Sequence, residues 1–232
     1  MKLISEEIER YKRQIPIEEF GKKGQEKLKS SSVLIVGMGG LGSAVSTSLN
    51  AVGIGKIGLI DGDEILISNL NRQTLYSHKD LKNKKVNVAK KKLKEQNIFT
   101  KFIIYDEFLN YKNAKKIIKE YDVIVDCTDN FETRHLLDEI CFELNKIWVY
   151  GSVYQFEGQI SVFHKNRNFK KLHQKQEKKI LEENYVIGLL PSIVGGLQAN
   201  EVLKILLGIG NILKNKLLIF NILKMKFYFF KI

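Results

Sequence analysis

The sequence predicts an α/β fold with a doubly wound sheet, parallel in its N-terminal part and continued by antiparallel strands in its C-terminal part. Up to residue 150, short β-branched runs alternate with segments of helical periodicity, as in sheets of parallel strands and crossover helices. After Gly151 this alternation stops, and the chain closes with two short apolar runs that suit a hairpin. We interpret residues 1–232 as one domain, with a nucleotide-binding section (residues 1–150) and a β-rich section (residues 151–232).

Each predicted element follows from a local signal. Strands are predicted where β-branched and aromatic residues form short runs: Val33–Val36, Ile57–Ile60, Phe102–Tyr105, Val123–Val125, Ile147–Tyr150, Gln159–Phe163, Leu217–Ile222 and Lys226–Phe230. Helices are predicted where apolar residues recur at helical spacing: Ser43–Val52, Lys79–Gln96, Ala114–Glu120, Phe131–Leu144 and Ser192–Leu207. The polar stretch Asn166–Asn184 is predicted to be a crossover, either ordered or a mobile lid.

Composition is that of an ordinary globular protein. The chain has 232 residues, of which 44% are hydrophobic and 28% charged, and it can bury a core without disulfides. No apolar segment suits a signal peptide or a membrane span, so we expect a cytoplasmic protein without a membrane partner. The net charge of +12 suits nucleotide and acidic-protein binding on a lysine-rich background; nucleic-acid binding is the less favoured explanation.

A glycine-rich turn predicts nucleotide binding. Residues Gly37–Gly42 fit the pattern G-x-G-x-x-G between a predicted strand and a predicted helix. Glycines at Gly37, Gly39 and Gly40 allow a tight turn and the close approach of a phosphate to the helix N-terminus. Asp61 ends the next predicted strand, where a carboxylate can accept hydrogen bonds from ribose hydroxyls. This Rossmann-like arrangement suits a redox dinucleotide or ATP; a tight turn without a ligand is the plainer alternative.

Charged residues near this turn favour phosphate chemistry. Ser68, Asn69 and Arg72 follow Asp61 closely, and Lys85 and Asp129 come later in the chain. Cations of this kind can clamp triphosphate oxygens, and an aspartate can hold Mg²⁺. Taken singly, the cations could be solvated surface charges, the serine and asparagine turn residues, and the aspartate a helix cap. Their joint spacing is what indicates a site.

Five sequence blocks resemble, in order, those of the ThiF/MoeB/HesA family, which is related to the ubiquitin-activating enzymes. They are Arg10–Gln14, Gly37–Gly42, Ser68–Gln73, Asp126–Asn130 and Glu157–Ile160. The resemblance continues through the predicted C-terminal helix and so covers nearly the whole chain. It implies an adenylyltransferase that uses ATP and Mg²⁺ to activate the C-terminal carboxylate of a small ubiquitin-like sulfur-carrier protein ending in Gly-Gly, for thiamine thiazole or molybdopterin synthesis.

The resemblance also implies residue roles. Asp61 would bind the ribose, Asp129 would bind Mg²⁺, and Arg13 would reach into the neighbouring subunit's site in a homodimer. The carrier would bind the β-rich section, residues 151–232. The implied nucleotide-binding residues are Gly37, Gly39, Gly40, Asp61, Ser68, Asn69, Arg72, Lys85, Asp129 and Asn130. The implied catalytic residues are Arg13, Arg72, Lys85 and Asp129.

Cysteine usage departs from the family pattern. Many members carry two CxxC pairs for a structural zinc, but neither Leu172–Lys175 nor the C-terminal stretch of this chain contains cysteine, so we expect no zinc. Some members have a loop cysteine that bonds to the carrier, and no cysteine follows Cys141 here. We therefore expect a separate sulfur donor, with Cys127 and Cys141 as buried structural thiols.

Three other functions are compatible with some of these features. A tRNA threonylcarbamoyladenosine dehydratase also adenylates a carboxylate and has a similar Ser-Asn-x-x-Arg-Gln block, and the basic charge would suit it. A degenerate member could bind the carrier without activating it, as the missing zinc ligands would suggest. A nicotinamide oxidoreductase is the most distant alternative, because hydride transfer needs no cluster of phosphate-binding cations.

Overall fold

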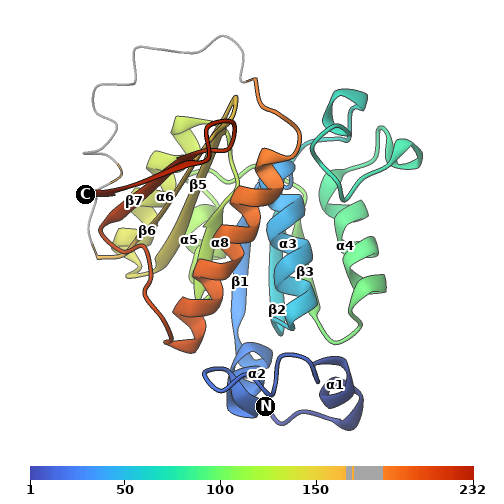
Figure 1. The fold of residues 1–232 in the computed structure, drawn as a ribbon. Helices are drawn as coiled ribbons and strands as arrows, with labels where there is room; N and C mark the ends of the chain where they lie inside the picture. The colour runs from blue at the N-terminus through green and yellow to red at the C-terminus, as the bar shows by residue number, and fades with distance from the viewer. Residues whose placement is uncertain (166–168, 170–184) are drawn as a thin grey trace.

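The computed structural model describes residues 1–165, 169 and 185–232. Within them, one sheet has the strand order β3-β2-β1-β4-β5-β6-β7-β8 (Figure 1). Its strands are β1 Ser32–Val36, β2 Lys56–Ile60, β3 Lys101–Tyr105, β4 Val123–Asp126, β5 Ile147–Tyr154, β6 Glu157–Phe163, β7 Lys216–Asn221 and β8 Lys226–Lys231. Strands β1 to β5 are parallel, and β5 to β8 pair antiparallel, which confirms the predicted fold class.

The centre of the parallel half brings three strand ends together. Strand β1 lies between β2 and β4, with Val36 in register with both Ile60 and Asp126. The chain therefore proceeds to one side of β1 through β2 and β3, and to the other side through β4 and β5. Ligands of open α/β sheets bind where the strand order reverses in this way, at the carboxyl ends of the strands.

Helices cover both faces of the sheet (Figure 1). One apolar cluster joins β1 to α3 (Gly40–Val52), α4 (Lys85–Gln96) and α8 (Leu190–Leu207). A second joins β1 to α5 (Ala114–Ile118) and α6 (Phe131–Glu143). Alternate residues of β1 enter different clusters, because successive side chains of a strand point to opposite faces.

Two N-terminal helices, α1 (Ser5–Arg10) and α2 (Gly21–Ser30), lie at the amino ends of the strands (Figure 1). The amide of Gly55, just before β2, donates to the carbonyl of Leu28 in α2 at 3.0 Å. The side chain of Asn97 donates to the hydroxyl of buried Tyr11 at 3.0 Å. These contacts fix the N-terminal segment at the end of the sheet opposite to the glycine turn.

The predicted helix Lys79–Gln96 was wrong in its N-terminal third. Lys82 has a positive φ of 65°, and its amide donates to the carbonyl of Ile65 at 2.9 Å, so residues 81–84 pair with the segment after β2 and do not form a helix. Helix α4 therefore begins at Lys85. The predicted crossover Asn166–Asn184 lies, apart from Phe169, outside the described residues. Among the described residues, no helix is long and apolar enough to cross a bilayer.

Candidate active site

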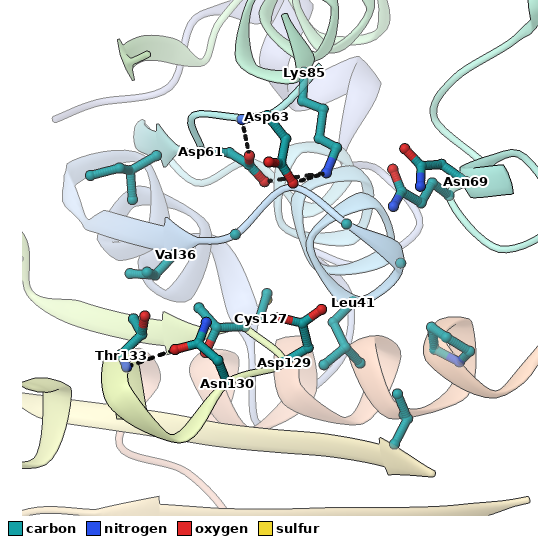
Figure 2. Close-up of a pocket in the computed structure, with 18 of the residues that line it drawn as sticks. Val36, Leu41, Asp61, Asp63, Asn69, Lys85, Cys127, Asp129, Asn130 and Thr133 are labelled. Carbon is teal, nitrogen blue, oxygen red and sulfur yellow. Dashed lines mark hydrogen bonds and ion pairs between the residues drawn. The ribbon is translucent and has the colours of Figure 1, made fainter. Parts of the chain in front are cut away.

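A pocket of about 290 Å³ opens at the carboxyl ends of β1, β2 and β4 (Figure 2). Most of the predicted nucleotide-binding residues line it: Gly37, Gly39, Gly40, Asp61, Asn69, Arg72, Lys85, Asp129 and Asn130. Ser68 and Arg13 are not among the lining residues. The sequence blocks therefore converge in space, although they come from separate regions of the chain.

The glycine turn places the N-terminus of α3 at this pocket. Gly37 has a φ of 93°, and a Cβ there would lie 2.7 Å from the carbonyl oxygen of Cys127. A Cβ on Gly42 would lie 2.1 Å from the carbonyl oxygen of Gly37. Neither position accepts a side chain, because backbone atoms cannot move aside cheaply. The free amides of the first helical turn and the helix dipole together suit an anion such as a phosphate.

The carboxylate of Asp61 is held rigidly at the pocket wall. One oxygen accepts the amide of Met38 at 2.7 Å, and the other accepts the amide of Asp63 at 2.8 Å. The residue is only 7% exposed, and this burial raises the pKa of Asp61, with the charge of Lys85 acting in the opposite direction. Both oxygens keep further lone pairs, so the group can accept hydrogen bonds from a ribose diol without moving.

Lys85 is buried between two aspartates. Its Nζ lies 2.7 Å from Oδ2 of Asp63 and 3.9 Å from Oδ2 of Asp61 (Figure 2). In this arrangement the ammonium group is neutralised by protein carboxylates, and a triphosphate would have to compete with Asp63 for it. Asp63 lines the pocket but was not among the site residues predicted from the sequence, although it lies only two residues after Asp61.

The loop after β2 supplies a half-buried cation, Arg72, to the pocket. Nη1 of Arg72 donates to the carbonyl of Ser68 at 2.8 Å, so Ser68 supports this arginine through its backbone. The Asn69 side chain accepts the amide of Leu66 at 3.0 Å and so fixes the start of the turn. Gln73, which was not in the predicted set, also lines the pocket, and its buried side-chain oxygen has no hydrogen-bond partner among the described residues.

The loop between β4 and α6 presents a carboxylate. Asn130 caps α6, because its side-chain oxygen accepts the amide of Thr133 at 2.9 Å. Asp129 is therefore not the helix cap, and its side chain is exposed at the pocket. The helix-cap role, which was the plainer alternative for Asp129, is therefore filled by Asn130. Asp129 remains available to a ligand.

Arg13 lies far from the pocket of its own chain. The side chain of its neighbour Gln14 donates to the carbonyl of Val52, the last residue of α3, at 3.0 Å. Helix α3 begins at the pocket and has 13 residues, which at 1.5 Å per residue gives about 20 Å. This is longer than an arginine side chain, so Arg13 cannot contact a ligand in its own pocket.

Both cysteines are buried, as predicted. Burial raises the pKa of the thiols of Cys127 and Cys141 well above the ordinary value, and nearby aspartates act in the same direction. Thiols in such surroundings are poor nucleophiles at neutral pH. The backbone of Cys127, not its sulfur, shapes the glycine turn.

These features define a class: an α/β protein with a pocket at a glycine turn, lined by cationic side chains and an exposed carboxylate. The sequence model of the ThiF family matches residues 11–232, and the chain belongs to this family. Similar proteins include a "Probable molybdopterin-synthase adenylyltransferase" of Porphyra purpurea, 44% identical over 98% of this chain. A "Sulfur carrier protein adenylyltransferase" of Thermus thermophilus is 40% identical over 94% of this chain.

Coverage differs between these relatives. The aligned region spans 61% of the Porphyra purpurea protein and 84% of the Thermus thermophilus protein.

Among solved structures, PaaA resembles the chain with a TM-score of 0.84 and 25% identity, over 99% of this chain and 75% of that chain. MccB of E. coli, in a crystal structure with ATP, has a TM-score of 0.76 and 22% identity over 96% of this chain and 73% of that chain, a likeness of fold alone.

Proposed function

We propose that the chain is an ATP-dependent adenylyltransferase acting on the C-terminal glycine carboxylate of a small ubiquitin-like sulfur-carrier protein. The observation that carries the proposal is the convergence of Arg72, Lys85 and Asp129 on the pocket at the glycine turn. Both relatives are named adenylyltransferases, and the name of one gives a sulfur carrier protein as the substrate. Of the two pathways considered, thiamine thiazole and molybdopterin, the name of the Porphyra purpurea relative favours molybdopterin.

The residues present fit a nucleoside triphosphate with Mg²⁺. Asp129 offers one exposed carboxylate at the pocket, and Mg²⁺ is commonly held by one or two carboxylates together with substrate phosphates. When bound, the ion would neutralise phosphate charge. Asp61 would orient the ribose, and the amides at the start of α3 would face a phosphate. Asn69 and Arg72 lie on the same loop at the pocket wall and would contact phosphate oxygens.

The proposed reaction needs positioning more than proton transfer. An oxygen of the carrier carboxylate attacks the α-phosphorus of ATP, the bond between that phosphorus and the bridging oxygen breaks, and pyrophosphate leaves as an acyl-adenylate forms. A C-terminal carboxylate is ionised at neutral pH, so no general base is required. Arg72 and Lys85 would stabilise the charge that develops on the phosphoryl oxygens. Lys85 would then exchange its contact with Asp63 for one with the triphosphate.

The sulfur step would follow on another molecule. The acyl-adenylate would accept sulfur from a separate donor, because both thiols of this chain are buried. The β-rich section, residues 151–232, would bind the carrier. No zinc is required for either role in this proposal.

A homodimer would complete the site. The family resemblance implies a role for Arg13 at an active site, yet the Arg13 of the same chain lies at the opposite end of α3. A second copy would bring its Arg13 to the pocket, in the manner of an arginine finger supplied in trans. In the proposed dimer, each chain would therefore supply a catalytic residue to the site of the other.

The alternatives are less well supported. Names of similar proteins favour the sulfur-carrier reaction over tRNA threonylcarbamoyladenosine dehydration. The pocket residues Arg72, Lys85 and Asp129 argue against a non-catalytic member, because a protein that only binds a carrier has no use for them.

Mass spectrometry of the carrier tests this proposal. The protein is incubated with ATP, Mg²⁺ and a recombinant carrier ending in Gly-Gly, and the carrier is then measured for a covalently attached AMP. We expect the adduct with the intact carrier and not with a carrier lacking its last glycine, and not with the Asp129→Ala protein. An intact carrier that never acquires AMP, although the protein is folded and binds the carrier, would contradict the proposal.

A further inference from the structure

A fully buried carboxylate, that of Asp126, immediately precedes the pocket-lining residues Cys127 and Thr128 in the chain. Asp126, the last residue of β4, has no exposed surface. Its Oδ1 accepts two hydrogen bonds from Thr128, one from the amide at 3.0 Å and one from the hydroxyl at 2.6 Å. Its Oδ2 accepts a hydrogen bond from Nε of Arg134 at 3.2 Å. The carboxylate therefore closes a tight turn at the carboxyl end of β4.

Arg134 extends this network to two other elements. It lies in the first turns of α6 and is only 5% exposed. Its Nη2 donates to the carbonyl of Thr128 at 2.7 Å and to the carbonyl of Gly151 in β5 at 3.3 Å. The guanidinium group also lies 5.3 Å from the ring centroid of Tyr150. One side chain thus joins the loop after β4 to α6 and β5.

Hydrogen bonds restrain the residues on both sides of Asp129. Thr128 is held at its amide by Asp126 and at its carbonyl by Arg134. The side-chain oxygen of Asn130 accepts a hydrogen bond from the amide of Thr133 at 2.9 Å. Asp129 lies between these two residues, and its own side chain is exposed. Its position is therefore set by its neighbours.

Fold stability alone is a weak explanation for this ion pair. Desolvation of two charges offsets much of their attraction, and a well-packed apolar pair of similar volume is often as stable. What an apolar pair cannot do is bond the Thr128 carbonyl and amide in a fixed direction. The planar guanidinium provides several donors at set angles, whereas a lysine provides one compact ammonium group.

We propose that Arg134 is a positioning residue for Asp129: through Asp126 and the Thr128 carbonyl, it fixes the loop so that the Asp129 carboxylate meets the metal-bound triphosphate. This inference rests on the proposed function and adds to it a residue that lines the pocket and supports the metal contact through the loop. Residues that support a metal ligand in this way typically change metal affinity by about 10–100-fold when they are replaced.

Calorimetry of nucleotide binding tests the role without any catalytic turnover. The wild-type protein and Arg134→Lys are titrated with ATP in the presence of Mg²⁺ and again with ATP in a chelator. For Arg134→Lys we expect Mg²⁺-ATP to bind about 10–100-fold more weakly and metal-free ATP to bind as tightly as to the wild type. Ile118→Ala, a core change in α5, serves as the control for a general loss of stability and should not show this selectivity.

Each outcome decides a different point. Equal weakening of both forms of ATP by Arg134→Lys, or no weakening at all, would overturn the positioning role. If Arg134→Lys does not fold, Thr128→Val decides, because it removes only the hydroxyl bond to Asp126 and should give a smaller loss of the same selectivity. A folded wild-type protein that binds neither form of ATP would contradict the proposed function itself.

Discussion

Arg13 provides the most quantitative prediction, because the pocket and this arginine lie at opposite ends of α3. We expect the Arg13→Ala and Asp129→Ala proteins each to be nearly inactive, since a trans arginine can contribute roughly 10³-fold or more to a rate. Mixing the two proteins should restore activity. In a heterodimer, the site with the intact Asp129 receives the intact Arg13 of the other chain, and the second site lacks both.

The size of the recovery follows from twofold symmetry. Equal amounts of the two proteins, after free subunit exchange, give half heterodimers, and each heterodimer has one complete site of two. About one quarter of the wild-type rate should therefore return. The assay is AMP transfer to the carrier, with subunit exchange checked by native mass spectrometry of differently tagged chains. Full exchange without recovery would refute the argument that Arg13 serves the other chain's pocket.

The other predictions concern single residues. Arg72→Ala should slow adenylation roughly a hundredfold, about 3 kcal/mol of transition-state stabilisation, with an unchanged melting temperature, because its observed contacts are exposed. Lys85→Ala should show a similar rate loss and also a lower melting temperature, since it leaves the buried Asp61 without its cation; an unchanged melting temperature would argue against the observed ion pair. Cys127 and Cys141 should react with a thiol reagent only after unfolding, because burial raises the pKa of both, and fast reaction of the folded protein would contradict this. Elemental analysis of untagged protein should find no stoichiometric zinc, and one tightly bound equivalent would show that a ligand set was overlooked.

The features of the site that follow local rules could be predicted from the sequence. The glycine turn and Asp61 are recognisable because a strand, a glycine-rich turn and a second strand succeed one another within a short stretch of chain. Arg72 and Asp129 lie in the family blocks, and the same resemblance implied a role for Lys85. The parallel register of β1, β2 and β4 brings the three residues together.

Features that depend on tertiary partners were missed. Asp63 is paired with Lys85 only because the chain turns at Lys82 and pairs back on the segment after β2, a turn that the helical pattern of residues 79–96 concealed. Arg134 lies on the predicted helix Phe131–Leu144 and had no predicted role. Its burial depends on Asp126 and on a carbonyl of β5, which no local pattern reveals.

Helix α2 was also missed, for a different reason. Gly24 in the helix interior lowers helix propensity by about 1 kcal/mol, and Gly21 has a positive φ of 61°, so local preference argues against a helix there. A Cβ on Gly24 would lie 3.4 Å from the side chain of Leu207 in α8. The helix is therefore stabilised by packing on the rest of the domain, which overrides its weak local preference.

The central claim is that this pocket transfers the AMP group of ATP to a carrier carboxylate and releases pyrophosphate. Isotope exchange from labelled pyrophosphate into ATP tests it most directly, because it detects reversible adenylation without any sulfur donor. We predict exchange that requires both Mg²⁺ and a carrier ending in Gly-Gly, and that is abolished by Asp129→Ala. Exchange that proceeds equally well without the carrier, or no exchange with folded protein and carrier present, would contradict the claim.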